Sequence, residues 1–477
     1  MNIKQLLDKS LAIQLSIVQF LMVNDERISI KELAYRLEVS LPTLQKELIH
    51  LQEAITACDE QSNLLKESKD YLKLSLSPHF SLKQFIYSYF KQTIDFELLF
   101  LLYKEKEIST TKIGMELQLS EASVFRRLKR LNQFMDEFAI QFKNKHLTGS
   151  EIQIRSFYYQ LFWQILPREQ IKSNFFQPAI GNLIIIFENQ FKVKFNPEQY
   201  SKLVVWIGIM HKRLDYRKIE ETNFNYQILE FIEADPLYQQ IKNILARYLS
   251  RFAFQWSQEE ILFLYLFFLS EDFFEINHEM MQQSPFVSKM ITINQKIGSV
   301  LLETNQKMDQ FQAYLVKQHV RIAFSKGWLE PVVHQAKLLS DMDAEKMSQC
   351  MSIIEESISE TPSNSQWRML DQAYRLIIDI YRRQQQSELY IGLALSPSLQ
   401  SLEYSRFIRQ QLAHLGVVTI ENARKNQVYD VLIADEYTDR PAFSYNQFYL
   451  SNGQTTQFEA NRVKKVIQDH MNHKGGS

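Results

Sequence analysis

The chain has 477 residues, of which 45% are apolar and 23% charged, and its formal net charge is −1. This length exceeds what one hydrophobic core supports and predicts about three to five domains, while the composition excludes a disordered chain. The near-zero charge excludes a global attraction to nucleic acid, so any such binding must come from local basic patches. Gly and Pro are scarce, at 11 each, which favours a mainly α fold.

Two cysteines, Cys58 and Cys350, provide neither a disulfide framework nor a zinc site, which fits a reducing cytoplasm. Residues 1–20 mix polar and apolar residues at helical spacing and do not have the form of a signal peptide. The longest apolar run, residues 261–269, is too short to cross a membrane. We therefore expect a cytoplasmic protein without membrane contact.

The first informative segment, residues 28–51, predicts two helices joined by a turn. Ser29 and Glu32 have the spacing of a capping box, and Ser40 with Pro42 marks the start of the second helix. This arrangement is typical of a helix-turn-helix. The second helix has a nearly neutral exposed face, and its residues with a capacity for DNA contact are Thr43, Lys46 and His50, accompanied by Glu47.

A second helix-turn-helix is predicted at residues 108–131, where the pattern of residues 28–51 returns after a shift of 80 positions. The match includes the small residue of the first helix, Ala34 or Gly114, and the serine that begins the second helix, Ser40 or Ser120. The predicted second helix carries an apolar stripe for packing and a basic face with no acidic residue between positions 122 and 134. Its candidate DNA-binding residues are Ser123, Arg126, Arg127, Lys129 and Arg130. The alternative is a basic face that is merely solvated.

Each predicted helix-turn-helix is followed by a hairpin pattern, at residues 64–74 and 140–155. These hairpins would be wings, and Lys143, Lys145 and His146 would place the second wing near a flanking phosphate. Alternatively, either hairpin closes the core of its own domain.

From about residue 157 to residue 383, aromatic-rich helical patterns predict two successive all-α domains. Each contains a histidine on an apolar helix next to basic residues, His211 and His319. Such a histidine could accept a phosphoryl group beside a cation, although a structural histidine is the alternative. From about residue 387, strands alternate with helices, which predicts a small α/β domain with a parallel sheet.

Few residues suggest catalysis. The two cysteines lack a partner histidine in a known motif, no His/Glu pair has metal-ligand spacing, and the carboxylate pairs Glu259-Glu260 and Glu271-Asp272 have the pattern of solvated helix ends. We therefore expect neither an enzyme nor a metal or cofactor site.

Taken together, the two winged helix-turn-helix units, the two histidine-bearing helical domains and the small α/β domain resemble the Mga/AtxA family of Gram-positive global virulence regulators. The most specific parts are the tandem helix-turn-helix segments and residues 147–163, which look like the wing and following helix of that family. The resemblance implies domains at 1–77 and 78–166 (winged helix-turn-helix), 167–283 and 284–385 (similar to phosphotransferase-system regulation domains, PRDs), and 386–474 (similar to a sugar-transporter EIIB component).

The resemblance also implies regulation by phosphorylation. His211 and His319 match the first histidine position of each PRD, whereas the second position of the first PRD falls near Phe267, and only His334 could serve in the second PRD. An active EIIB carries a cysteine after its first strand, where this chain has Ser396-Pro397-Ser398, so the family suggests a role in dimerisation rather than phosphotransfer.

The leading hypothesis is thus a homodimeric regulator that binds double-stranded DNA, pairs through its EIIB-like and PRD-like domains, and receives phosphate transiently from sugar phosphocarrier proteins. Two alternatives stay open. A PRD-containing RNA antiterminator would begin with a β-rich domain, whereas this chain begins with helical patterns. A sugar-phosphotransfer component would need an acceptor cysteine after Leu395.

Overall fold

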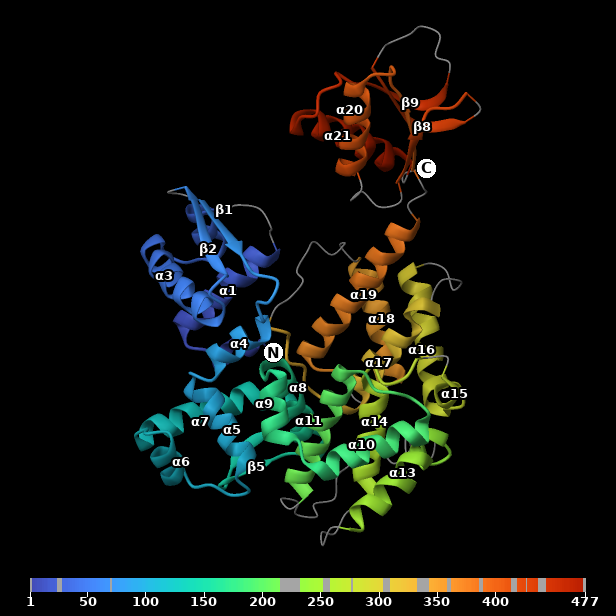
Figure 1. Ribbon diagram of the computed structural model, residues 1–477. Coiled ribbons are helices and arrows are strands. Elements are labelled where there is room, and N and C mark those ends of the chain that lie inside the picture. The colour runs from blue at the N-terminus through green and yellow to red at the C-terminus, as the bar shows by residue number, and fades with distance from the viewer. Residues whose placement is uncertain are drawn as a thin grey trace. The chain divides into compact units, whose positions relative to one another are not determined.

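The computed structural model describes residues 2–474 except 24–27, 69–70, 215–231, 252–257, 276–277, 303–308, 333–342, 358–361, 386–388, 413–417, 426 and 436–442. The chain forms two compact units, residues 1–375 and residues 376–477 (Figure 1). The first unit is predominantly helical, and the second is built on a parallel sheet. Among the described residues, no helix combines the length and the hydrophobicity that crossing a membrane requires.

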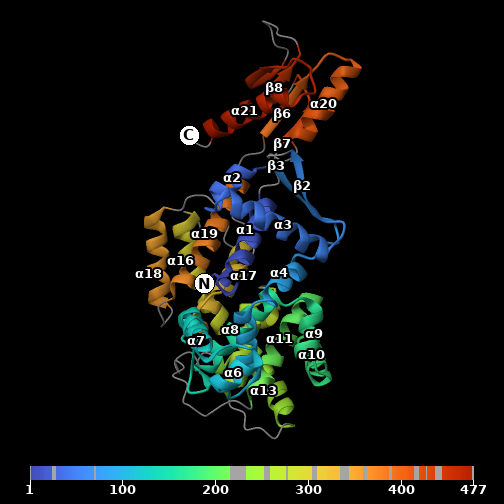
Figure 2. The same ribbon diagram turned by 90° about the vertical axis from the view of Figure 1, so that its left-hand side faces the viewer.

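The N-terminal region of the first unit is a winged helix-turn-helix. After the short η1 (Ile3–Leu6) and α1 (Lys9–Val23) come β1 (Ile28–Ser29), α2 (Ile30–Arg36), α3 (Leu41–Cys58), β2 (Asn63–Ser68) and β3 (Tyr71–Ser75). The strands form an antiparallel sheet in the order β1-β3-β2, which lies beside α1–α3 in Figure 2. The helix-turn-helix and the hairpin predicted at residues 64–74 are therefore both confirmed.

A second helix-turn-helix follows. It contains α4 (Leu82–Phe90), α5 (Ile94–Lys104), α6 (Thr110–Glu116), α7 (Glu121–Met135), η2 (Asp136–Phe138), β4 (Gln141–Lys143) and β5 (His146–Thr148). The predicted repeat extends to the backbone, because Glu38 and Gln118 occupy the same position of the turn and both have a φ of 54°. The helix starts are also equivalent: the side chains of Ser40 and Ser120 accept hydrogen bonds from the backbone amides three residues later.

The second hairpin is shorter than predicted. β4 and β5 are joined by Asn144 and Lys145, whose φ angles of 53° and 71° make a two-residue turn. Residues 151–155, predicted as part of the hairpin, instead begin α8 (Glu151–Ile165). The error has a physical reason: α8 is buried around most of its circumference, so alternation at Ile152 and Ile154 does not distinguish a strand from a helix.

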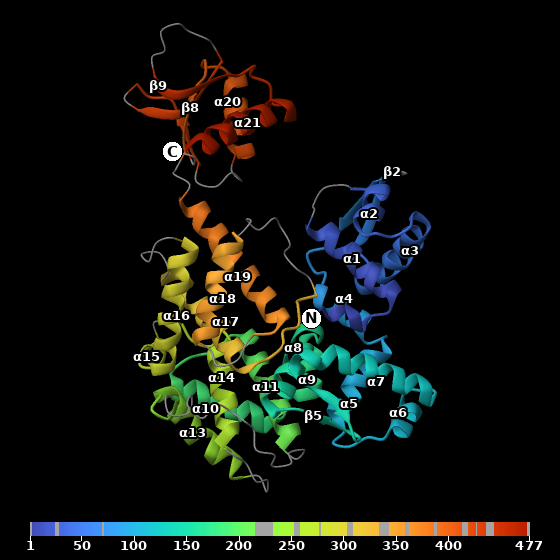
Figure 3. The ribbon, with the colours of Figure 1, turned by 180° about the vertical axis from the view of Figure 1, so that it is seen from behind.

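The remainder of the first unit is a helical assembly, as predicted (Figure 3). Helices α8, α11 and α14 are adjacent, and aromatic rings fill the space between them; Trp206, for example, stacks on Phe267 with 4.4 Å between ring centroids. The described helices are α9 (Arg168–Phe175), α10 (Pro178–Phe191), α11 (Pro197–Leu214), α13 (Pro236–Leu249), α14 (Gln258–Ser270), α15 (Glu279–Gln282), α16 (Pro285–Leu302), α17 (Asp309–Phe324), α18 (Ala344–Ser357) and α19 (Asn364–Gln385), whose last ten residues belong to the second unit.

The second unit contains a four-stranded parallel sheet in the order β7-β6-β8-β9. Its elements are β6 (Leu389–Ala394), α20 (Leu399–Leu412), β7 (Val418–Asn422), β8 (Val428–Ala434), β9 (Ser444–Leu450) and α21 (Gln457–Lys474). A core of aliphatic residues and tyrosines joins the sheet to α20 and α21. The mainly α multidomain fold with a small α/β domain is confirmed, while the division into five domains stays a prediction.

Candidate nucleic-acid interface

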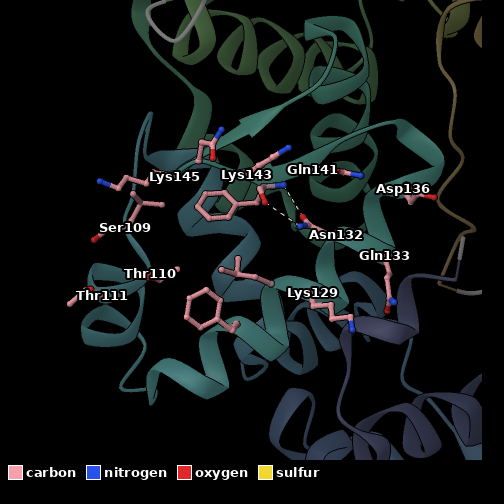
Figure 4. A pocket seen from close by; sticks show the side chains of 15 residues that line it. Ser109, Thr110, Thr111, Lys129, Asn132, Gln133, Asp136, Gln141, Lys143 and Lys145 are labelled. Carbon is pink, nitrogen blue, oxygen red and sulfur yellow. Dashed lines mark hydrogen bonds between the residues drawn. The ribbon is translucent and has the colours of Figure 1, made fainter.

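A groove of about 880 Å³ lies between α7 and the wing formed by β4 and β5 (Figure 4). Lys129 of α7 lines it on one side, and Lys143 and Lys145 of the wing line it on the other. Most of the remaining lining side chains are uncharged and polar, and Asp136 adds a single carboxylate. The uncharged polar residues of this groove are Ser109, Thr110, Thr111, Asn132, Gln133, Gln141 and Asn144.

The wing is held against α7 by hydrogen bonds from one side chain of that helix. The amide of Asn132 donates to the carbonyl of Phe142 at 3.1 Å and accepts from the Phe142 N–H at 2.7 Å. The wing turn is fixed separately, because the Ile108 N–H donates to the Lys145 carbonyl at 2.7 Å. These bonds set the spacing between Lys129 and the two wing lysines before any ligand binds.

On α7 the solvent-exposed stripe differs from the predicted basic face. Ala122, Arg126, Lys129 and Gln133 are exposed at i, i+4, i+7 and i+11, and Phe125 beside them is 55% exposed. Arg126 donates to the Ser123 hydroxyl at 3.1 Å. Of the residues predicted on α7, Arg126, Lys129 and Arg130 are exposed, and Ser123 and Arg127 are partly buried.

Arg127 and Arg130 lie instead next to α5, where both pair with the fully buried carboxylate of Asp95. The Arg127 contact is 2.5 Å. One buried anion therefore neutralises part of the charge of both arginines, and DNA contact by Arg127 and Arg130 stays a prediction. Arg127 is only a quarter exposed, whereas Arg130 is half exposed and keeps part of its guanidinium toward solvent.

The equivalent position of the first copy has the opposite charge. Glu47 occupies the place of Arg127 and is buried against α1, where it accepts hydrogen bonds from Ser10 and, at 2.7 Å, from Gln14. Burial raises the pKa of Glu47, but the hydrogen bonds outweigh burial and the net shift is downward. Lys46 and His50 are exposed, His50 lies 3.6 Å from Glu53, and Thr43 bonds the Ser40 hydroxyl.

Helix α8, which follows the wing, is tied to α11 and α14 by a buried network of four ions. Arg155 donates two hydrogen bonds to the Glu260 carboxylate, of 2.5 and 2.9 Å. Arg213 donates two to the Glu151 carboxylate, of 2.9 and 2.6 Å. Arg155 also bonds Glu151 at 3.2 Å, which joins the two pairs. Bidentate geometry of this kind fixes the relative orientation of the three helices.

The other side of α8 bonds the segment that follows α17. Gln153 donates to the Phe324 carbonyl and accepts from the Lys326 N–H, both at 2.7 Å. The Ser156 and Ser325 hydroxyls bond at 2.8 Å, and Gln160 accepts from the Leu329 N–H at 2.9 Å. α8 thus connects the winged region to α11, to α14 and to the segment at the end of α17.

His211 lies on α11, two residues before Arg213, and is half-buried. Its Nε2 is 2.8 Å from the Tyr248 hydroxyl, and the two rings stack. Burial lowers the pKa of His211 to about 4, although the Glu260 carboxylate partly opposes the shift. The imidazole is therefore neutral at physiological pH, which is the form that can act as a nucleophile.

His319 differs from the predicted, partly buried histidine. It is fully buried, its Nδ1 lies 2.6 Å from the Asn294 amide oxygen, and its Nε2 lies 2.9 Å from the Tyr374 hydroxyl. Burial lowers its pKa to about 3. Since both ring nitrogens are occupied inside the protein, this arrangement is that of a structural histidine.

In the described residues, the structure places no second histidine in either PRD-like region at the positions that the resemblance implies. Phe267 is part of the aromatic core, packed against Tyr159 and Trp206, and His334 lies outside the described residues. No group of three or more potential metal ligands occurs in the described part of the chain.

Two carboxylates predicted at solvated helix ends are buried instead. Glu260 is fully buried with Arg155, and Glu271 pairs with Lys202 at 2.9 Å and with Arg321 at 2.8 Å. Sequence reasoning also missed Asp95 and Asn132. Asp95 lies 32 residues from its arginine partner, so helical periodicity contains no signal for that pair.

Two segments of the chain match known protein families. Residues 78–162 match the Mga helix-turn-helix domain, and residues 181–271 match the PRD domain. The first match contains the α7–wing groove and most of α8, and the second contains His211 and Glu260. No curated protein matches the chain. The matched domains are those of a DNA-binding transcription regulator linked to the sugar phosphotransferase system.

Proposed function

We propose that this chain, whose Mga helix-turn-helix and PRD domains match the Mga/AtxA family of transcription regulators, binds double-stranded DNA through the α7–wing groove. The observation that carries the proposal is that Lys129, Lys143 and Lys145 line one groove, whose α7 and wing sides are joined by the Asn132 hydrogen bonds. α7 would enter the major groove while the wing follows the adjacent backbone. The uncharged polar side chains between the lysines are of the type that bonds phosphate and sugar oxygens.

The first winged helix-turn-helix would add a weaker contact. Thr43, Lys46 and His50 offer one fixed positive charge on α3, compared with the several cations of the second copy. Affinity should therefore come mainly from the second copy. A titration of a labelled DNA duplex with the full chain at several salt concentrations tests the proposal; preferential binding of an RNA hairpin would contradict it.

Regulation would act through phosphorylation of His211. The ring is half-buried rather than enclosed, in contrast to His319. A phosphoryl group adds about −1.5 to −2 charges near neutral pH. On His211 that charge would lie two residues from Arg213 and in the field of Glu260, two members of the ion network that holds α8. Repulsion of Glu260 and attraction of Arg213 would both alter the anchoring of the DNA-binding region.

Incubation with phosphoenolpyruvate and the general phosphotransfer proteins is expected to label the full chain at one acid-labile site. The His211→Ala variant should lose the label, and His319→Ala, if folded, should retain it. Labelled protein is expected to show an altered duplex affinity in the titration above. Equal labelling of wild type and His211→Ala would contradict this assignment.

The second unit would mediate homodimerisation. Leu399 and Leu402 at the start of α20 and Phe458 at the start of α21 are 85%, 68% and 68% exposed. Both helices begin after the carboxyl ends of parallel strands, β6 and β9, which places these residues at the same edge of the sheet. Exposed apolar groups so arranged favour self-association.

Light scattering of the full chain is expected to give a dimer mass that falls toward the monomer mass in the variant Leu399→Ser/Leu402→Ser/Phe458→Ser. Exchange of exposed residues leaves the core of the unit intact, and circular dichroism checks its fold. If the variant stays dimeric, these three residues do not form the dimer interface.

A further inference from the structure

A cavity of about 570 Å³ that is open to solvent lies in the first unit, between the winged region and the helical assembly. Its walls come from α4, α8, α11, α14, α17 and residues 328–332. The volume is within the range of small-molecule sites, and the position at the junction of several elements is typical of them. The cavity does not include the α7–wing groove or His211.

One wall is a cluster of aromatic rings. Tyr159 meets Phe267 edge-to-face at 4.9 Å and Trp206 edge-to-face at 5.7 Å, and Trp206 stacks on Phe267. Trp163 and Trp328 line the same space. Flat apolar walls of this kind accept a planar ring and fix its orientation.

The cations of the cavity are not equivalent. Lys202 and Arg321 are both paired with Glu271, and Lys202 also contacts Glu198 at 3.1 Å. Lys83 lies over the ring of Trp163 at 4.2 Å, and among the described residues no carboxylate lies within ion-pair distance of its ammonium. Lys83 thus supplies one cation that the protein itself does not neutralise by contact.

The cavity also contains an unused acceptor. The Gln164 amide donates to the Leu329 carbonyl at 2.7 Å, while its buried Oε1 accepts no hydrogen bond in the described part of the chain. A buried polar atom without a partner is costly. Oε1 is covered by neighbouring atoms, so a ligand that donates a hydrogen bond to it displaces part of that cover and removes the cost.

We propose that this cavity binds a small aromatic monocarboxylate that carries a hydrogen-bond donor on its ring. The carboxylate pairs with Lys83, the ring packs against the outer surface of the Tyr159, Trp206 and Phe267 cluster, and the donor reaches Gln164. A single unpaired lysine matches one negative charge, whereas Glu271 and Asp272 in the same lining oppose a dianion such as phosphate. The inference does not depend on the proposed DNA binding.

The residues that line the cavity come from several helices, so a bound ligand would contact all of these helices. Tyr159 and Gln164 belong to α8, Trp206 to α11, and Arg321 to α17. A bound ligand would therefore contact α8, which anchors the winged region, and also α11 and α17 of the helical assembly.

Tryptophan fluorescence tests the proposal directly, because three of the five tryptophans, Trp163, Trp206 and Trp328, line the cavity. The probe is 4-hydroxyphenylacetate, titrated into the full chain, and a dissociation constant of about 1 mM or lower is expected for a ligand of this size in a preformed cavity. Phenylacetate lacks the donor and is expected to bind about 3-fold more weakly. 4-Hydroxyphenylacetamide lacks the charge and is expected to bind at least about 10-fold more weakly.

The Lys83→Gln variant should lose about 10-fold in affinity for the acid and bind the acid and the amide equally, while Lys83→Arg should recover binding. Lys172→Gln, at an exposed lysine on α9, is the matched control and should bind as wild type. Thermal melting of each variant confirms folding. Absence of saturable binding by either carboxylate, tighter binding of inorganic phosphate, or unchanged affinity in Lys83→Gln would each overturn the proposal.

Discussion

Replacing Arg155 with Met is expected to lower the free energy of unfolding of the first unit by about 3–5 kcal/mol, because it leaves Glu260 buried without its partner. Arg155 is 1% exposed and Glu260 is fully buried, so water cannot replace the lost contacts. Glu151 would lose one of its two arginines as well. Urea denaturation followed by tryptophan fluorescence measures the effect, since Trp163 and Trp206 report on the helices that the network joins.

Two further variants give this measurement its controls. Arg36→Met removes a surface arginine paired with Glu32 at 3.6 Å, and its cost should be within about 0.5 kcal/mol. Arg155→Met/Glu260→Leu removes both charges and should recover most of the loss. A cost for Arg155→Met no greater than that for Arg36→Met would show that the network does not stabilise the junction.

The second large effect is expected in DNA binding. Replacing Lys129, Lys143 and Lys145 with Ala removes three positive charges from the α7–wing groove. If each contacts one phosphate, the slope of log K against log salt concentration should become shallower by about 2.7. Affinity at a salt concentration of about 100 mM should fall by roughly 100-fold or more. Fluorescence anisotropy with a labelled duplex at four salt concentrations gives both quantities.

The matched control removes three lysines from elsewhere on the first unit. Lys91, Lys172 and Lys289 are exposed and lie outside the groove, so the control changes net charge by the same amount. Its salt slope should stay near that of wild type. If both triple variants lost the same affinity for the duplex, the loss would reflect net charge rather than the groove. That result would contradict the proposed interface.

The elements that sequence reasoning located best are those with local signals. The repeat of 80 residues, the capping serines and the shared turn were all sufficient to place α2–α3 and α6–α7, because capping and turn geometry depend on neighbours within four residues. The two central strands of the second unit, β6 and β8, were equally accessible, since buried parallel strands appear as short apolar runs.

What the sequence did not show depends on residues far apart in the chain. The charges on Arg126, Arg127 and Arg130 look equivalent until Asp95 is placed beside two of them. His211 and His319 have similar neighbours in sequence, yet only the packing of Asn294 and Tyr374 encloses His319. Burial of this kind follows from tertiary contacts rather than from spacing on one helix, so the two histidines could not be told apart beforehand.

The connections of α8 also constrain how the protein can fold while it is being made. Arg155 leaves the ribosome 105 residues before Glu260, and Ser156 leaves 169 residues before Ser325. At about 5–20 residues per second, α8 waits roughly 5–30 s for partners that bury its charged and amide side chains. During that interval the nascent winged region presents a helix whose partners have not yet been made, so we expect slower synthesis of residues 260–329 to lengthen its exposure.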